Sequence, residues 1–226
     1  MKKRVILLAA LFVLAGIASV RAAAITVPNF SFEDCPLPDG GFVYNPADVW
    51  AYSPINTGGV QNPDSGFYSP AGLAMIDGQM VAFSNGGTIS QMLAANLAPS
   101  TLYTLSVLVG DRTDVNNVNT DWAIRLYAGS TLLSETTKSN TLVPVPDTMF
   151  ATETIGYVSP ASGPLLGQAL KIELYSSDIQ YNFDKVQLDA TAVLGPAAVP
   201  TPSAALGGIA TLAMLLGWRR MKTLHV

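Results

Sequence analysis

Regular alternation of apolar and polar residues is the feature that most constrains the fold of this chain. Leu170–Tyr175 alternates cleanly, and Tyr181–Leu188 repeats the pattern. Successive side chains of a β-strand point to opposite faces, so this period places one face in a core and the other in water. Between the two ends of the chain, no long stretch has the period of a helix. The pattern therefore predicts strands with one buried face.

Further strands follow from β-prone runs between turn residues. Leu102–Val109 is bounded by Pro99 and Gly110, and Phe150–Val158 alternates again. Residues 122–127 place Trp122, Ile124 and Leu126 on one face, and 128–131 form a hairpin turn. The stretch 36–70 is rich in Pro, Gly, Asn and Asp, which indicates long loops around one strand at Val49–Tyr52. We therefore predict an all-β antiparallel sandwich over residues 25–190, large enough for one domain.

The charges between the two ends are mostly negative. The chain has 12 basic and 16 acidic residues, and seven of the basic ones lie in the ends (Lys2, Lys3, Arg4, Arg21, Arg219, Arg220, Lys222). The five remaining basic residues face all sixteen acids, so the body has a formal net charge of −11. Such a body repels nucleic acid and anionic lipid, and it suits cation binding.

Catalytic chemistry based on histidine is excluded for the body. Cys35 is the only cysteine, and the only histidine, His225, lies near the end of the tail. A catalytic thiol or serine needs a base beside it, and Cys35 is read more simply as a small buried apolar residue beside Phe32.

The N-terminal end reads as a secretory signal peptide. Lys2, Lys3 and Arg4 precede an apolar run from Val5 to Ala18, and Ala22–Ala24 resembles a cleavage site. The run is shorter than the roughly 20 residues of a membrane span. We expect signal peptidase to remove residues 1–24, so that the mature protein starts at Ile25 and is exported.

The C-terminal end is a second apolar segment beside basic residues. A linker at 191–198 leads to residues 199–226, where Ala204–Trp218 forms the predicted transmembrane helix and Arg219 and Arg220 follow it. Basic residues beyond a span place the tail in the cytoplasm and the body outside. A plain tail anchor remains an alternative interpretation.

The motif at this end, Val199, Pro200, Thr201, Pro202 and Ser203, together with Arg219 and Arg220, resembles the PEP-CTERM sorting signal. Thr201 stands where that family has its central Glu. The resemblance implies cleavage by an exosortase, a membrane-embedded cysteine protease, and release to the cell surface or the extracellular matrix. Before processing, the helix would hold the protein in the envelope membrane.

The body resembles galactose-binding-like jelly rolls, among them carbohydrate-binding modules. The resemblance lies in Val27–Glu33 as an opening strand, the turn at Asp77–Gly78, the strand Ile89–Gln91 and Phe183–Leu188 as a closing strand. In that family the first and last strands are neighbours. The resemblance therefore implies that Glu33 and Asp184 hold a structural Ca²⁺, with solvated strand-end acids as the alternative.

Several residues are candidates for sugar binding. An aromatic face can pack on a sugar ring, which selects Trp50, Tyr52 and Trp122, while Asp111 and Arg112 follow a strand directly. Each also has an ordinary structural explanation as a core residue or a member of an ion pair.

The sequence points to no catalytic residue. A glycoside-active enzyme would use two carboxylates about 5–10 Å apart, and nothing distinguishes one pair among sixteen acids. We therefore expect no enzyme, but an exported binding or structural module for carbohydrate or exopolysaccharide. A secreted glycoside-active enzyme is the alternative.

Overall fold

The computed structural model describes residues 22–113, 120–139, 141 and 144–193. Contacts divide the chain into one unit at Met1–Val193 and another at Leu194–Val226. The signal peptide, the sorting motif and the helix predicted at 204–218 lie outside the described residues and stay predictions. Within the described ranges, the structure contains no helix with the length and hydropathy needed to cross a membrane.

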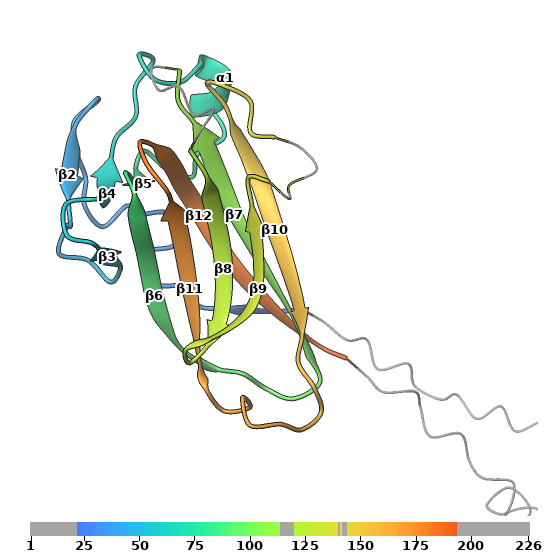
Figure 1. Ribbon diagram of the computed structural model, residues 1–226. Helices are drawn as coiled ribbons and strands as arrows, with labels where there is room; N and C mark the ends of the chain where they lie inside the picture. Colours follow the sequence, from blue (N-terminus) through green and yellow to red (C-terminus); the bar gives the residue numbers. More distant parts are fainter. Residues whose placement is uncertain (1–21, 114–119, 140, 142–143, 194–226) are drawn as a thin grey trace, which may run out of the picture. The chain divides into compact units, whose positions relative to one another are not determined.

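The described residues form twelve strands and one short helix (Figure 1). The elements are β1 Ala23–Ile25, β2 Phe42–Tyr44, β3 Ala51–Ser53, β4 Gly58–Gln61, α1 Pro70–Leu73, β5 Val81–Ser84, β6 Gly87–Asn96, β7 Thr101–Asp111, β8 Trp122–Ala128, β9 Thr131–Thr137, β10 Phe150–Val158, β11 Ala169–Ser176 and β12 Tyr181–Ala192.

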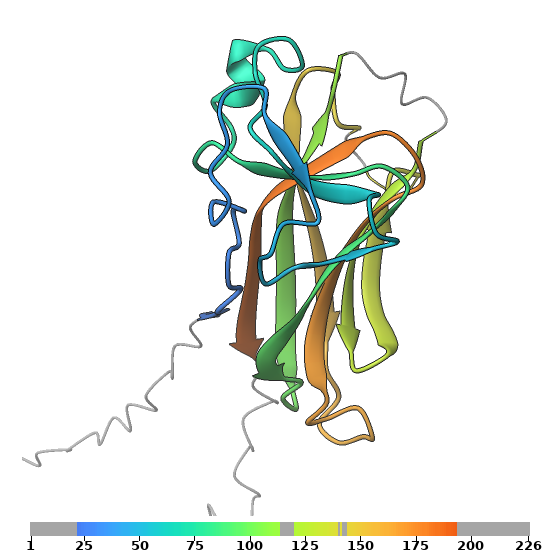
Figure 2. The same cartoon turned by 90° about the vertical axis from the view of Figure 1, so that its left-hand side faces the viewer.

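Two antiparallel sheets pack face to face, as Figures 1 and 2 show. One has the order β10-β7-β12-β5-β4-β2, with β1 also pairing with β12, and the other has the order β3-β6-β11-β8-β9. The prediction of an all-β sandwich is confirmed. The expected strands at 102–109, 122–127, 150–158, 170–175 and 181–188 are all present, and β12 continues to Ala192.

The core lies between the sheets and is built by the alternation seen in the sequence. Leu105, Val107 and Val109 of β7 belong to the same apolar cluster as Ile172 and Leu174 of β11. All five side chains are fully buried. Burying a side chain of this size contributes about 1.5–3 kcal/mol relative to leaving it in water. The inner faces therefore supply most of the stability of the sandwich.

The expected opening strand at Val27–Glu33 is wrong. Asn29 and Phe32 have φ values of 48° and 61°, and the Phe32 N–H donates to the Asn29 carbonyl at 3.2 Å, so the chain turns here. Phe32 is fully buried, with its ring 5.1 Å from that of Trp50. The strand that pairs with β12 is instead β1, at Ala23–Ile25.

A second, smaller apolar cluster lies on the outer face of the larger sheet. We call residues 62–80, which include α1, the covering segment. Its residue Tyr68 packs with Val81, Leu108 and Phe150, and the Tyr68 and Phe150 rings stack at 4.6 Å. Leu108 alternates with the core residues of β7, so this cluster lies on the opposite side of the sheet from the core.

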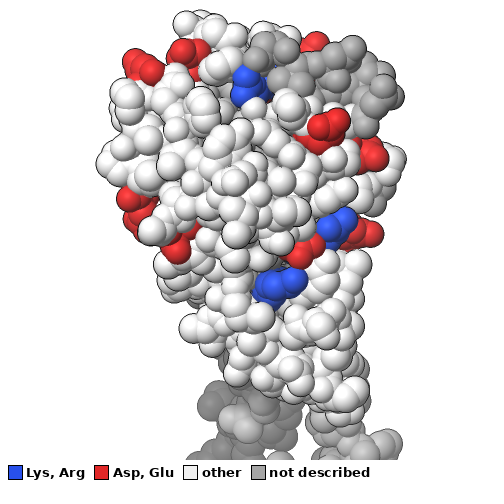
Figure 3. All heavy atoms as spheres, turned by 60° about the vertical axis from the view of Figure 1, so that its left-hand side comes forward, with Lys and Arg blue, Asp and Glu red and all other residues white. Residues whose placement is uncertain are grey.

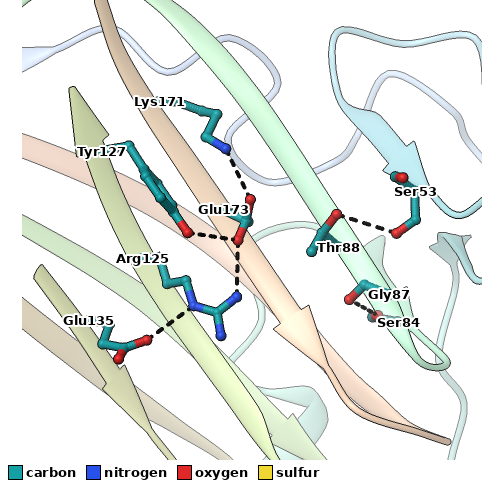
Figure 4. A network of polar contacts seen from close by, with 9 residues as sticks. All are labelled: Ser53, Ser84, Gly87, Thr88, Arg125, Tyr127, Glu135, Lys171 and Glu173. Atoms are coloured by element: carbon teal, nitrogen blue, oxygen red, sulfur yellow. Dashed lines mark hydrogen bonds and ion pairs between the residues drawn. The ribbon is translucent and has the colours of Figure 1, made fainter. Parts of the chain in front are cut away.

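The outer face of the smaller sheet carries paired charges (Figure 4). Arg125 contacts Glu135 at 3.1 Å and Glu173 at 3.0 Å, Lys171 contacts Glu173 at 3.0 Å, and the Tyr127 hydroxyl donates to Glu173 at 3.1 Å. Figure 3 shows acidic groups spread over one face of the molecule, with few basic groups among them.

Candidate functional site

Three polar side chains lie in a row under the covering segment. We call Gln180, Asn182 and Asp184 the β12 polar row; they alternate with Tyr181 and Phe183 of the core. Gln180 is 4% exposed, and Asn182 and Asp184 are 0% exposed. Buried polar groups need partners, so each member of the row defines a local network.

Asn182 occupies the middle of the row and pairs with Tyr68. The Tyr68 hydroxyl donates to Asn182 Oδ1 at 2.7 Å, and Asn182 Nδ2 donates to the Ala82 carbonyl at 3.1 Å. These bonds tie the covering segment to the sheet beneath it. Gly110 of β7 leaves room for the Phe150 ring, which stacks on Tyr68. A Cβ at Gly110 would lie 2.3 Å from that ring.

Asp184 is brought close to Glu33, as the resemblance implied. Asp184 Oδ2 accepts from the Asp77 N–H at 2.6 Å, and Glu33 Oε1 accepts from the N–H groups of Gln79 and Met80 at 2.8 and 2.7 Å. One turn therefore touches both carboxylates. Gly78 in this turn has a φ of +95°, and a Cβ there would lie 2.3 Å from Glu33 Oε1.

Burial raises the pKa of Asp184 to about 7, and the charges of Asp77 and Glu33 add to the rise. The backbone N–H groups of Asp77 and Lys185, which donate to the carboxylate, act in the opposite direction. β12 is irregular between Asp184 and Gln187, where Lys185 has a φ of 49°. The strand thus holds a carboxylate where burial opposes its ionisation.

Gln180 borders a cavity of about 200 Å³ that we call the aromatic cavity. Four aromatic rings and a set of polar residues line it: Phe42, Tyr44, Phe67, Phe83, Gly40, Gln61, Asn62, Asn85, Arg112 and Gln180. The Phe83 ring makes edge contacts with Tyr44 at 5.2 Å and Phe42 at 6.3 Å. The Arg112 guanidinium lies 4.0 Å from the centre of the Phe67 ring.

Amide side chains form a chain of hydrogen bonds in the wall of the aromatic cavity. Arg112 donates to Gln180 Oε1, and Gln180 Nε2 donates to Gln61 Oε1 at 3.2 Å. Two buried atoms of the lining, Gln61 Nε2 and Asn85 Oδ1, have no hydrogen-bond partner. A pocket that is mainly apolar, with a few placed polar groups, is the usual form of a ligand site.

Two other hollows are larger but carry less chemistry. One of about 330 Å³ lies along β1 and β12, and one of about 310 Å³ lies beside Met75, Leu108 and Lys185. Among the residues the structure describes, no lining atom of either is a buried polar atom without a partner. The aromatic cavity is therefore the stronger candidate site.

The residues predicted to bind sugar do not gather at one place. Trp50 and Trp122 are 3% and 1% exposed and belong to the core. The Tyr52 hydroxyl donates to Asp48 at 3.0 Å, at β3. Asp111 is buried and lies on the core side of β7, where its charge helps burial to raise the pKa of Tyr181. Of the five, only Arg112 lines the aromatic cavity.

The candidate site residues that the sequence interpretation missed are Gln61, Tyr68, Gln180 and Asn182. The alternation over Tyr181–Leu188 predicts one buried and one wet face. Both faces of residues 180–184 are buried, because the covering segment lies over the second one. No local pattern in the sequence predicts that the covering segment lies over this face.

Comparison with known proteins gives the family. A family model described as HpiC1 cyclase matches residues 23–189. A solved apo-form cyclase from Fischerella sp. is 25% identical, with a TM-score of 0.64, over 77% of this chain and 98% of that one. No curated protein matches the chain.

Two further solved structures show the same fold with compounds bound. A cyclase from Fischerella sp. TAU in complex with 4-(1H-indol-3-yl)butan-2-one is 22% identical, with a TM-score of 0.62, over 76% of this chain and 100% of that one. The Stig cyclase Fisc from the same source, in complex with (3Z)-3-(1-methyl-2-pyrrolidinylidene)-3H-indole, is 23% identical at the same TM-score and coverage.

These matches overturn the expected function. The body predicted as a non-catalytic module for carbohydrate is the part that the cyclase model matches, so the predictions of no enzyme and of carbohydrate binding are wrong. These matches give no support to the alternative of a glycoside-active enzyme. Over residues 23–189, the chain belongs to the HpiC1-like family of cyclases.

Proposed function

We propose that the protein is a cyclase that closes a ring on a small aromatic substrate held in the aromatic cavity. The observation that carries the proposal is the wall of four aromatic rings with a guanidinium and amides among them. The indole compounds bound by cyclases of the same fold suggest an indole-like bicyclic ring as the substrate class.

The cavity supplies confinement and a defined electrostatic environment. Ring closure within one molecule is limited by the entropy of folding a flexible chain into a reactive conformation, and a close-fitting wall removes part of that cost. The faces of Phe42, Tyr44 and Phe83 can stabilise positive charge that develops on the substrate. Among the described lining residues there is no carboxylate, so the polar groups near a bound substrate are amides, the Tyr44 phenol and the Arg112 guanidinium.

Binding of 4-(1H-indol-3-yl)butan-2-one, measured by calorimetry, tests the proposal. Phe42 is 62% exposed, so Phe42→Ala should remove a wall of the cavity with little effect on folding. We expect this variant to weaken binding by about tenfold, the usual range for an aromatic contact residue. Ile55→Ala is the matched control, because Ile55 is 75% exposed and does not line the cavity. No saturable binding, or equal losses in both variants, would overturn the proposal.

We further propose that Glu33 and Asp184 hold a structural Ca²⁺. Support comes from two converging carboxylates and from a buried Asp184 whose ionisation a cation would favour. The described residues contain no group of three or more His, Cys, Asp or Glu that could hold a metal, so backbone carbonyl groups would have to complete the shell of oxygen ligands that Ca²⁺ takes. When bound, the ion would fix the covering segment against β12.

Export of the cyclase domain is also proposed, on the signal peptide at 1–24 and the tail at 199–226. Cleavage before Ile25 would remove Ala23 and Ala24 of β1, which pair with Ala190 and Asp189, and would leave only the pair between Ile25 and Leu188. Intact-mass measurement on protein from the native source decides this. A mature start at Ile25 with the tail lost is the expected result, and a mass that includes Arg219 and Arg220 would contradict processing of the tail.

A further inference from the structure

The hydrogen-bond chain in the wall of the aromatic cavity has a fixed direction. A guanidinium can only donate, so the Gln180 atom that faces Arg112 must be its oxygen. The Gln180 amide nitrogen then faces Gln61 and donates to it at 3.2 Å. Gln61 must therefore accept with its own oxygen. Amide orientations are often ambiguous, but here Arg112 determines both of them.

The chain ends in a donor without a partner. Gln61 is 6% exposed, its Nε2 is a buried atom with no hydrogen bond, and the residue lines the aromatic cavity. Leaving such a donor unpaired is unfavourable. A ligand that fills the cavity beside Nε2 without an acceptor leaves this donor unpaired, whereas a ligand that carries an acceptor there gains a hydrogen bond.

We infer that the ligand of the aromatic cavity presents a hydrogen-bond acceptor, such as a carbonyl oxygen, to Nε2 of Gln61, and that Gln61 determines specificity for such ligands. The inference rests on the proposed function, because it concerns the same cavity. It narrows the substrate class from an aromatic compound to one whose ring carries an acceptor within reach of the cavity wall.

Asn85 Oδ1 is a second unpaired atom of the lining, but it does not define what a ligand must present. Asn85 Nδ2 lies 3.4 Å from the Tyr44 hydroxyl, which can donate or accept. The direction of that amide is therefore not fixed by its neighbour. Among the described lining residues, Gln61 is therefore the one whose unpaired atom has a fixed requirement, for a hydrogen-bond acceptor on the ligand.

A pair of matched probes tests the inference. The ketone 4-(1H-indol-3-yl)butan-2-one carries an acceptor, and 3-butylindole has the same ring and chain length without it. We expect the wild-type protein to bind the ketone about tenfold more tightly than the hydrocarbon, since only the ketone pairs the Gln61 donor. Gln61→Leu should bring the ratio close to one. Gln61→Glu, which keeps an acceptor for Gln180 but presents an oxygen to the ligand, should weaken ketone binding.

Gln91→Leu is the matched control. Gln91 is also buried, at 4% exposure, and its Oε1 also lacks a partner, but it lies on β6 and does not line the cavity. The tenfold preference should survive this change. Melting curves of all variants check that they fold.

An infrared difference spectrum of the ketone with a ¹³C-labelled carbonyl gives a readout that does not depend on any variant. A hydrogen bond to Gln61 should shift the carbonyl stretch of the bound ketone to lower frequency than in an apolar solvent. An unshifted band, equal affinities for the two probes, or a preference that survives Gln61→Leu would overturn the inference while leaving the cavity as an aromatic site. If neither probe binds, the proposed function itself fails, and this inference fails with it.

Discussion

The outer faces of the two sheets carry polar side chains in similar strand patterns but under different conditions. On the smaller sheet, Arg125 lies between Glu135 and Glu173, and these side chains are 22%, 38% and 13% exposed. On the larger sheet, the β12 polar row is at most 4% exposed beneath the covering segment. The first face pairs its charges in contact with water, and the second buries two neutral amides and one carboxylate.

The difference in burial between the two faces affects the pKa values of Glu173 and Asp184 in opposite directions. Burial opposes the ionisation of Glu173, but hydrogen bonds from Lys171 and Arg125 outweigh it and hold the pKa of that carboxyl below its ordinary value. Burial of Asp184 instead raises its pKa to about 7. Polar groups that cost stability are expected where they serve a function. The contrast supports the proposal that the larger sheet's outer face serves function, and it suggests that the smaller sheet's outer face serves stability.

The largest expected effect is the pH dependence due to Asp184. Its folded pKa, about 7, lies above the ordinary value of 3.8, so between these values the native state binds more protons than the unfolded state. Stability should therefore fall as the pH rises from 4 to 8, by an upper bound of roughly 4 kcal/mol. Urea unfolding in the presence of a chelator measures it.

Asp184→Asn should remove most of this dependence and make the protein more stable than the wild type at pH 8. Glu173→Gln is the control on the other face and should lower stability at pH 8. Equal behaviour of the two variants would break the assignment of the two faces.

A second prediction concerns Ca²⁺. A ligand bound only by the native state, at a hundredfold excess over its Kd, adds about 2.7 kcal/mol, or a rise of roughly 5–10 °C in Tm for a domain of this size. Differential scanning fluorimetry with chelator and with Ca²⁺ measures it, and Mg²⁺ should do less. Asp184→Asn should reduce the rise. The same Tm under both conditions would show that Glu33 and Asp184 are not metal ligands.

The fold was largely predictable, because alternation encodes strands locally. Leu170–Tyr175 and Phe150–Val158 became β11 and β10 with little change. Val27–Glu33 failed because a run rich in β-prone residues does not reveal that Asn29 and Phe32 take positive φ values to bury the Phe32 ring.

The site was far less predictable. The family resemblance implies Glu33 and Asp184 as calcium ligands, which stays a prediction, and one turn donates hydrogen bonds to both carboxylates. The aromatic cavity was not foreseen, because its walls come from residues as distant as Phe42 and Gln180. Contacts between segments so far apart depend on how the strands are ordered in the sheet, which alternation does not encode. Trp122 was selected as a sugar ligand by residue type, and it is buried in the core.

A third prediction compares one hydroxyl on each face. Tyr68→Phe leaves Asn182 Oδ1 without its bond from Tyr68 at a fully buried position, which should cost about 1–3 kcal/mol. Tyr127→Phe removes a bond to Glu173, which keeps its ion pairs, and should cost about 0.5 kcal/mol or less. Chemical denaturation of both variants at pH 7 measures the difference. A larger loss from Tyr127→Phe would contradict the view that burial distinguishes the faces.

The smallest expected effect is the coupling between Arg125 and Glu173. Their atoms lie 3.0 Å apart, but solvent reaches both side chains, so the pair should contribute only about 0.5–1 kcal/mol. A double-mutant cycle with Arg125→Gln and Glu173→Gln isolates that energy.

The folded pKa of Glu173 is lowered, so its contribution is fully present above the ordinary value of 4.5 and is lost as the pH falls through the folded pKa. Salt near 1 M shortens the screening length to about 3 Å and should reduce the coupling. The effect of Asp184 should persist in the same salt, because burial and not a distant charge is its main cause. A coupling energy that stays constant in salt would mean that the smaller sheet's outer face is shielded from water as the β12 polar row is, and the contrast between the two faces would then fail.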